Sequence, residues 1–357
     1  MKVFGRILMA GVAVVSLCAV SAWSLTPASD ASAQTTAVAD AAHLQPAGTL
    51  DGAGDPVGVP CAVRAGEGEY PNPLNECQAA DPGIVVRGDT WYAFTTGLRL
   101  YRSLDAGHSW SNLGQFLTPP TGYVDAWAPE VYRIGTLWIC YFSMRPGPGQ
   151  FAKVFVATSH DLETGWTLRS EPLAEDPTVS MIDASMFRAP TGQRYLLYKE
   201  IGNRRIMIDR LSADGLHRAQ QATPILSNTL PWEGNSVEAP TMVYRAYDNR
   251  YYLFYSGNLY TPTGHYGVGV ARADSPTASF DAGKLPGPIL AEDADFASPG
   301  HQFHTWVRID GQPTEVLFYH AYARNDPDGN PLPSPAPRAL MMDELHWGSD
   351  GWPWVND

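Results

Sequence analysis

Three acidic residues stand at matching places in short, similar segments of this chain. The segments are Ala80-Asp81-Pro82, Asp183-Ala184-Ser185 and Glu238-Ala239-Pro240. Acetal hydrolysis without a cofactor requires a proton donor and a carboxylate that activates water or attacks carbon. A third carboxylate nearby raises the pKa of the donor by like-charge repulsion. If the fold brings the three side chains together, they form a set suited to that chemistry.

Two other residues occupy the same place in related segments, Trp127 before Ala128-Pro129 and His301 before Gln302-Phe303. The ring of Trp127 can stack on the apolar face of a sugar or pack inside the fold. His301 can fill the site as a hydrogen-bonding residue, hold water or ligate a metal ion. The sequence leaves these alternatives open.

The elements that must position these residues are repeated β-hairpins. Each hairpin has a short apolar strand, a turn containing Gly, Asn or Asp, and a longer aromatic strand. A third strand and a fourth apolar patch follow, so that one unit spans about 45 to 65 residues. The aromatic strands are expected at residues 90–94, 136–142, 194–198, 250–255 and 315–319.

Five such units predict an all-β fold, a five-bladed β-propeller with four-stranded antiparallel blades. A β-sandwich is the alternative, but it does not explain why the same order of elements recurs five times. In a propeller, the first strand of each blade lines the central channel. We therefore expect the residues at the five blade heads to meet at one end of that channel, namely Asp81, Trp127, Asp183, Glu238 and His301.

The beginning of the chain is typical of an export signal. A positively charged start precedes an apolar stretch over residues 7–20, and Ala31-Ser32-Ala33 matches a cleavage site. The alternative, a membrane anchor, is disfavoured because the apolar stretch is short. We therefore expect a signal peptide at 1–33, cleaved after Ala33, a flexible linker at 34–60 and the propeller at 61–357 of a secreted protein.

Cysteine usage fits an oxidising compartment. Cys61 and Cys77 bracket a loop rich in Pro and Asn and are expected to form a disulfide. Cys140 lies within an apolar strand and is expected to be a buried free thiol.

The charge of the chain bears on its partners. It has 24 Lys and Arg against 37 Asp and Glu, a formal charge of −13. This disfavours a nucleic acid and is compatible with a neutral oligosaccharide or polysaccharide. The chain lacks a G-x-S-x-G elbow, an H-E-x-x-H helix and a phosphate-binding glycine loop. We expect no required cofactor and no stable membrane insertion, and we take a monomer as the working expectation.

From about residue 75 onward, the chain resembles glycoside hydrolase family 43, in the five-bladed clan of furanosidases and xylosidases. The resemblance rests on the three acidic segments together with Trp127 to Val131, Ser298 to His301 and Arg338 to Leu340. Each segment alone is a weak signal, and their order and spacing are what is specific. The resemblance implies hydrolysis of arabinofuranosidic, xylosidic or galactofuranosidic linkages, expected in that order.

The resemblance also implies a role for each site residue. Asp81 would be the general base that activates water, Glu238 the general acid, and Asp183 the residue that tunes and orients the acid. The mechanism would be inverting, with base and acid carboxyls roughly 6.5–9.5 Å apart. Arg338 matches a position that contacts substrate hydroxyls, and we expect Trp127 and His301 to contact the substrate as well. His301 matches a central His that in some members lies beside a channel-bound calcium ion or a water cluster.

One segment departs from the family pattern. Many members continue after the central His with Asn-Ser, whereas this chain has Gln302-Phe303-His304. We expect this change to lie close to the sugar subsite. The resemblance therefore does not identify the sugar, nor does it distinguish endo from exo action.

Two other function classes compete with this interpretation. Ser103 to Trp110 fits the S-x-D-x-G-x-x-W box of sialidase-like propellers, but only one good copy is present and no arginine stands at a blade head. A non-catalytic sugar-binding propeller is the second alternative. It needs aromatic residues and hydrogen bonds, but it has no need for three carboxylates.

Overall fold

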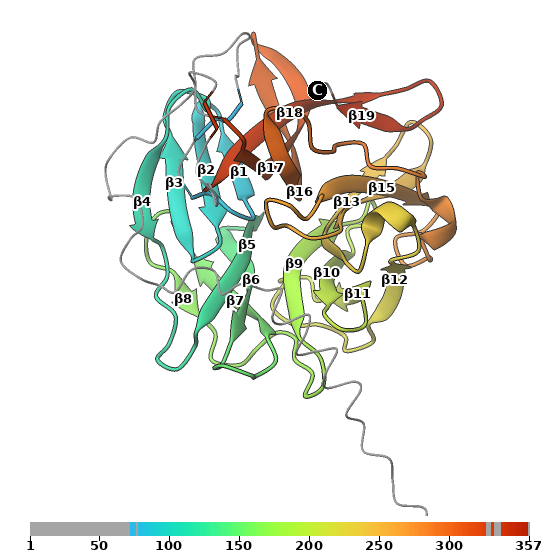
Figure 1. The fold of residues 1–357 in the computed structure, drawn as a ribbon. Helices are drawn as coiled ribbons and strands as arrows, with labels where there is room; N and C mark the ends of the chain where they lie inside the picture. The colour runs from blue at the N-terminus through green and yellow to red at the C-terminus, as the bar shows by residue number, and fades with distance from the viewer. Residues whose placement is uncertain (1–71, 76–77, 326–329, 332–336, 356–357) are drawn as a thin grey trace, which may run out of the picture.

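Each predicted hairpin heads one antiparallel sheet in the computed structural model, which describes residues 72–75, 78–325, 330–331 and 337–355. The sheets surround a common axis, and the first strand of each lies nearest the centre (Figure 1). The predicted five-bladed β-propeller is therefore confirmed.

The strands of each blade pair in chain order from the axis outward. Blade 1 contains β1 (Gly83–Arg87), β2 (Thr90–Thr95), β3 (Arg99–Ser103) and β4 (Ser111–Gln115). Blade 2 contains β5 (Asp125–Ile134), β6 (Leu137–Arg145), β7 (Lys153–Ser159) and β8 (Thr167–Leu168). Blade 3 contains β9 (Met181–Arg188), β10 (Arg194–Glu200), β11 (Arg205–Leu211) and β12 (Thr223–Ser227).

The last two blades differ in how their outer edge is built. Blade 4 contains β13 (Val237–Arg245), β14 (Arg250–Gly257) and β15 (Gly267–Ala273), and residues 284–290 take the fourth position through single bridges to β15. Blade 5 contains β16 (Phe296–Ile309), β17 (Gln312–Ala323), β18 (Arg338–Trp347) and β19 (Pro353–Val355). Two short 3-10 helices flank blade 4, η1 (Pro231–Glu233) and η2 (Asp281–Gly283).

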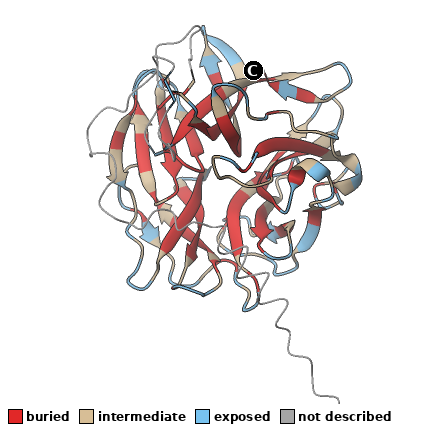
Figure 2. Cartoon of the chain, in the orientation of Figure 1, coloured by how far each residue is buried: buried red, intermediate tan, exposed pale blue. Residues whose placement is uncertain are grey.

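The hydrophobic core is divided among the five interfaces between neighbouring blades. Side chains alternate between the two faces of a strand, so each blade contributes to two interfaces. On β2, Trp91 packs toward blade 5 and meets Phe318 edge-on with ring centroids 5.7 Å apart. Tyr92 and Phe94, on the other face, pack toward blade 2. Figure 2 shows the buried residues concentrated on the inner and middle strands.

The segment before blade 1 closes the ring by pairing with blade 5. The Leu74 N–H donates to the Leu340 carbonyl at 2.8 Å, and the Ala79 N–H donates to the Arg338 carbonyl at 2.9 Å. The two ends of the propeller are thereby joined side by side. As a consequence, Asp81 and Arg338 come from opposite ends of the sequence to the same place.

Several sequence predictions fall outside the described residues. These are the signal peptide at 1–33, the linker at 34–60 and the Cys61–Cys77 disulfide. Cys140 is a buried free thiol, as predicted, and burial raises its pKa. Within the described ranges, no helix has the length and apolar character needed to span a membrane.

Gly83 allows the inner strands of blades 1 and 2 to approach closely. A Cβ atom at this position would lie 2.3 Å from the Pro129 carbonyl oxygen. We expect Gly83→Ala to lower the free energy of unfolding by about 1–3 kcal/mol, because the strands must move apart. Thermal unfolding measures the loss. Gly287→Ala is the control, since a Cβ there meets nothing within 4 Å. Equal melting temperatures for the two variants would contradict this account of the interface.

Candidate active site

Each blade head contains a residue with a left-handed backbone next to the site. These residues have φ between 49° and 56°, and in blades 2 to 5 the strand register shifts beside them. Bulges of this kind re-aim side chains and are common next to active sites, and each left-handed non-glycine residue costs about 1–3 kcal/mol. The residues are Asp81, Ala128, Asp183, Ala239 and His301.

The sequence analysis expected Asp81, Trp127, Asp183, Glu238 and His301 to occupy equivalent backbone positions. The structure shows that this expectation is off by one residue in blades 2 and 4. Ala128 and Ala239 hold the left-handed position, so Trp127 and Glu238 lie one residue before it. The sequence comparison aligned the five segments by their acidic, aromatic or histidine side chains. The structure instead aligns them by the left-handed residue, which in blades 1, 2 and 4 directly precedes a proline. Glu238 therefore enters the site from a different backbone position than Asp81 or Asp183.

Asp81 is a buried carboxylate with a partner on each oxygen. Its Oδ1 accepts a hydrogen bond from Arg338 at 2.9 Å, and its Oδ2 accepts one from the Thr96 hydroxyl at 2.5 Å. Burial alone would raise the pKa of Asp81. The charges of Arg338 and His301 outweigh burial, and they hold this pKa well below its ordinary value. Asp81 is therefore ionised at neutral pH.

Glu238 is also held as a carboxylate. Its Oε2 accepts hydrogen bonds from the Lys199 ammonium at 2.6 Å and the Ser236 hydroxyl at 3.0 Å, and its Oε1 accepts one from the Tyr266 hydroxyl at 2.6 Å. Burial would raise the pKa of Glu238, but the charge and hydrogen bond of Lys199, aided by Tyr266, lower it. To act as a proton donor, Glu238 must therefore bind a proton although the positive charge of Lys199 favours its ionised form.

Asp183 differs from the other two because no cation contacts it among the residues that the structure describes. Its Oδ2 accepts a hydrogen bond from the Ala239 N–H at 3.1 Å. Burial, together with the negative charges of Glu238 and Asp81, raises the pKa of Asp183 to about 6, although His301 and Lys199 oppose the rise. Asp183 is thus the member of the three that takes up a proton most readily.

His301 lies within electrostatic range of the three carboxyl groups and lowers the pKa of each. Its Nδ1 is 3.4 Å from Oδ1 of Asp81, and its backbone N–H donates to the Ser256 hydroxyl at 2.8 Å. Asp81, Asp183 and Glu238 therefore share one buried site at the end of the channel, as the sequence analysis expected.

Arg338 and Trp127, both predicted to contact substrate, are largely buried. Arg338 is paired with Asp81, and its guanidinium lies 4.9 Å from the centroid of the Tyr260 ring. Trp127 packs against Ile182 and Ile201, with the Arg145 guanidinium 5.5 Å from its ring centroid. This packing explains why Trp127 is only 7% exposed. The substrate-binding role of both residues stays a prediction.

Sequence reasoning missed four residues that hold the carboxylates in place, Lys199, Thr96, Tyr266 and His320. The Thr96 hydroxyl also accepts the Ala128 N–H, at 3.1 Å. The Asp81 N–H donates to Nδ1 of His320, at 3.2 Å. Each residue lies on, or directly beside, a strand that was predicted for its apolar character. These residues could have been predicted by looking for polar side chains at the channel end of each apolar strand.

Tyr266 reaches Glu238 because Gly300 leaves room for its ring. A Cβ atom on Gly300 would lie 2.1 Å from the tyrosine ring. The pKa of Tyr266 is raised well above its ordinary value, by burial first and then by the charges of Glu238 and Asp183. Tyr266 therefore keeps its proton and donates it to the Glu238 carboxylate in a hydrogen bond.

A further buried carboxyl, Glu130, lies within electrostatic range of Asp183. It accepts a hydrogen bond from the Tyr132 hydroxyl, which in turn accepts the Met186 N–H at 3.1 Å. Burial raises the pKa of Glu130 to about 8, and the charge of Asp183 contributes to the rise. Glu130 is therefore mostly protonated at neutral pH and adds little negative charge to the site.

The described residues do not fit a protein-ligated metal site. No three His, Cys, Asp or Glu side chains among them are arranged to hold one ion together. The Asp81 oxygen nearest His301 is also the oxygen that Arg338 occupies. The calcium ion predicted beside His301 stays a prediction, and no step of the proposed mechanism goes through it.

The segment that departs from the family pattern serves mainly to pack blade 5 against its neighbours. Gln302 is buried, and its side chain donates to the Ala239 carbonyl at 2.6 Å and accepts from Ser256 at 2.9 Å. Phe303 belongs to the core between blades 5 and 1, and His304 pairs with Glu315 at 2.6 Å. The expected proximity of this segment to the sugar subsite stays a prediction.

The S-x-D-x-G-x-x-W box forms a turn between β3 and β4. The Asp105 carboxylate accepts from the Ser103 hydroxyl at 2.7 Å and from the Ser109 N–H at 2.8 Å, and the Trp110 indole donates to the Gly107 carbonyl at 2.9 Å. These contacts account for the box as a structural element, so it gives no support to a sialidase.

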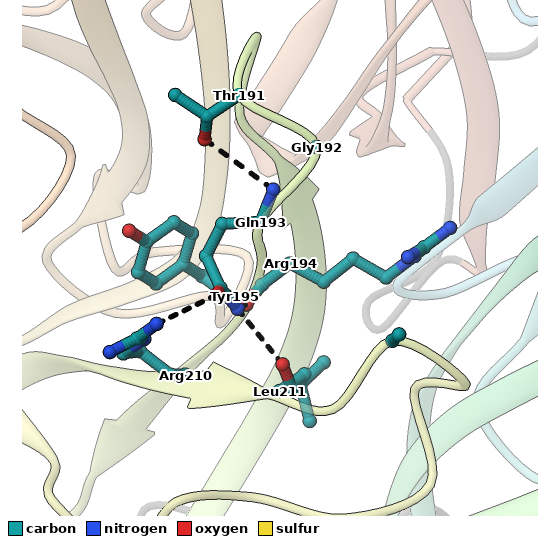
Figure 3. Close-up of a pocket in the computed structure, with 8 residues that line it drawn as sticks. Thr191, Gly192, Gln193, Arg194, Tyr195, Arg210 and Leu211 are labelled. Carbon is teal, nitrogen blue, oxygen red and sulfur yellow. Dashed lines mark hydrogen bonds between the residues drawn. The ribbon is translucent and has the colours of Figure 1, made fainter.

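A pocket of about 500 Å³ lies at the other end of blade 3 (Figure 3). Its lining includes Thr191, Gln193, Tyr195 and Arg210, and it contains none of the blade-head residues. Along β10, Lys199 lies roughly 15 Å beyond these residues. The pocket is therefore separate from the carboxylate site.

A five-bladed propeller with a cluster of buried carboxylates at its channel end defines a class of carbohydrate-active protein, and the comparisons identify the family within it. Residues 70–353 match the model of the glycosyl hydrolases family 43. This chain belongs to that family.

Curated relatives agree with this assignment. Alpha-L-arabinofuranosidase 43 of Humicola insolens is 28% identical over 318 residues, which cover 82% of this chain and 64% of that relative. An extracellular exo-alpha-(1->5)-L-arabinofuranosidase of Streptomyces avermitilis is 27% identical over 315 residues, which cover 80% of this chain and 62% of that relative. The chain thus spans less than two-thirds of the length of these two relatives.

Solved structures support the fold. A thermostable family-43 glycoside hydrolase matches with a TM-score of 0.65 at 24% identity, covering 85% of this chain and 96% of the solved chain. At this identity the likeness concerns the propeller alone.

The ionisation of Glu130 gives a testable pH dependence of stability. Its pKa is about 8 in the folded chain, above the ordinary value for a glutamate. A raised folded pKa contributes stability at low pH that is lost as pH rises toward 8. We therefore expect Glu130→Gln to gain melting temperature relative to wild type between about pH 5 and about pH 8. A constant difference between the two proteins, measured by calorimetry over that range, would contradict the buried neutral carboxyl.

Proposed function

We propose that this protein is a secreted, inverting glycosidase that hydrolyses α-L-arabinofuranosidic bonds in arabinan or its oligosaccharides. The observation that carries the proposal is the unequal compensation of three buried carboxyls. Asp81 is paired with Arg338, Glu238 is paired with Lys199, and Asp183 has no cation in contact among the described residues. Groups of the same type with separated pKa values are typical of acid–base sites.

Asp81 is the general base in this mechanism. Its low pKa keeps it ionised, and Arg338 and Thr96 fix the carboxylate plane. Asp81 takes a proton from a water molecule while the water oxygen bonds to the anomeric carbon from the face opposite the leaving group. Inversion follows from this single displacement.

Glu238 is the general acid, and its proton goes to the glycosidic oxygen as the carbon–oxygen bond breaks. Glu238 and Asp183 titrate as an interacting pair, so the proton that they bind belongs to both. Repulsion between the two disfavours the doubly ionised state, which is how Asp183 assists the acid. Proton exchange with water then resets Asp81 and the pair.

The choice of arabinofuranosides rests on the family and on the names of the two relatives. One of them is named an extracellular enzyme, which supports export of this chain. Xylosides and galactofuranosides come next in the order of expectation. Polysaccharide and aryl glycosides of all three sugars belong in the same substrate screen.

The base and the acid should respond differently to the leaving group. We expect Asp81→Ala to lose activity on every substrate, since no leaving group replaces an activated water. Glu238→Ala should lose about 10²- to 10⁴-fold on arabinan, but much less on an aryl arabinofuranoside with a good leaving group. Steady-state kinetics on the two substrates measures both effects. Equal losses for Glu238→Ala on both would rule out its role as the acid.

A matched control separates chemistry from the loss of a buried ion pair. Asp209 and Arg218 form such a pair in blade 3, at 3.3 Å, away from the channel. Asp209→Ala should lower stability while the folded protein keeps its turnover. No hydrolysis by wild type of any arabinoside, xyloside or galactofuranoside would contradict the proposed function.

Asp183 should affect the pH profile. Removing its charge lowers the pKa of the neighbouring acid, so Asp183→Asn should move the alkaline limb of the kcat/KM profile to lower pH. The measurement is the rate on an aryl arabinofuranoside across the pH range. A limb that stays in place would show that Asp183 serves only to position its neighbours.

A further inference from the structure

We propose that Lys199 is a positioning residue for Glu238, one that orients the carboxyl and compensates its charge after each proton transfer. This role rests on the proposed function. Nothing in the sequence pattern singled out Lys199, because it follows directly after the strand at 194–198 that was predicted from its aromatic residues.

The ion pair is built across two blades. Lys199 is on β10 in blade 3 and Glu238 is on β13 in blade 4, and their Nζ and Oε2 atoms are 2.6 Å apart. The two side chains are only 7% and 11% exposed. The Ser236 hydroxyl accepts from Lys199 at 2.7 Å and donates to the same Oε2 at 3.0 Å. The three groups therefore lock one oxygen of Glu238 in place.

The other charged and titratable groups around Glu238 do not duplicate Lys199. Tyr266, on the opposite oxygen, keeps its proton. Asp183 carries negative charge when ionised. His301 also lowers the pKa of Glu238, but its ring nitrogen lies against Asp81 and forms no ion pair with Glu238. Arg338, the other cation that pairs with a carboxylate of this site in the described part of the chain, is committed to Asp81. Lys199 is thus the group whose charge is matched to Glu238.

This arrangement has a direct chemical consequence. When the proton passes from Glu238 to the glycosidic oxygen, a carboxylate is left in a buried site. The ammonium group of Lys199 already lies 2.6 Å from Oε2 of Glu238, so it stabilises that carboxylate without having to move. Lys199 also limits the pH range in which Glu238 holds a proton, so its removal should widen that range toward alkaline pH.

The first test compares Lys199→Met with Lys199→Arg on arabinan and on an aryl arabinofuranoside. Lys199→Met should move the alkaline limb of kcat/KM to higher pH by about one unit or more. It should also lower kcat on arabinan about 10- to 100-fold, because the acid loses its anchor. Lys199→Arg keeps the charge, so its limb should stay close to that of wild type. If Lys199→Met leaves the alkaline limb of the kcat/KM profile at the same pH as in wild type, the proposal is wrong.

A matched control comes from a second buried lysine–glutamate pair. Lys284 and Glu233 are 2.6 Å apart with side chains 2% and 0% exposed, and they lie outside the carboxylate site. Lys284→Met should lose stability but keep the wild-type pH limb. If both Met variants shift the limb alike, the effect is a general result of destabilisation and the proposal fails.

The second readout needs no substrate, so it separates this proposal from the proposed function. A lowered folded pKa of Glu238 contributes stability above its unfolded pKa that is lost as pH falls. The gap in melting temperature between wild type and Lys199→Met should therefore narrow from about pH 7 to about pH 4. A constant gap would contradict the ion pair. If Lys199→Met does not fold, Lys199→Gln, which keeps a hydrogen-bond donor without charge, should give the same narrowing and the same limb shift.

A wild type that cleaves no glycoside, combined with a narrowing gap, would contradict the proposed function while confirming the Lys199–Glu238 pair. An active wild type with an unmoved limb and a constant gap would contradict the role of Lys199 alone.

Discussion

Burial of three like-charged groups in one site is the constraint on which this structure depends. The charges of Asp81 and Glu238 both raise the pKa of Asp183, so each of the three buried groups must be compensated or neutral. Two carboxylates are compensated by a buried cation, Arg338 or Lys199. The third, Asp183, has a backbone N–H, and its pKa rises to about 6. Unequal compensation turns three similar groups into a base, an acid and a modulator.

The propeller supplies this compensation across its blade interfaces. Arg338 in blade 5 reaches Asp81 at the head of blade 1, and Lys199 in blade 3 reaches Glu238 in blade 4. The first of these pairs exists because the segment before blade 1 pairs with β18 and closes the ring. The contacts that hold the blades together therefore also set the charges of the site. A change at these interfaces is expected to affect stability and acid–base behaviour together.

The hairpins could be predicted from the sequence because turn residues and aromatic strands are local patterns. The three acidic blade heads could be predicted because the segments that carry them occur in the order and spacing typical of the family. The cations could not be assigned to partners in the same way. Lys199 lies 39 residues from Glu238, and Arg338 lies 257 residues from Asp81. The bulges also moved Glu238 by one backbone position, which depends on strand pairing rather than on residue type.

The anomeric configuration of the first product tests the central claim most directly. If Asp81 is held ionised by Arg338 as a base for water, hydrolysis of an α-L-arabinofuranoside must first release the β anomer. Proton NMR of the reaction mixture, recorded before the sugar mutarotates, distinguishes the two anomers. Initial release of the β anomer is the result that the charge arrangement predicts. Initial release of the α anomer would mean a covalent intermediate, and it would contradict the assignment of Asp81 as the base.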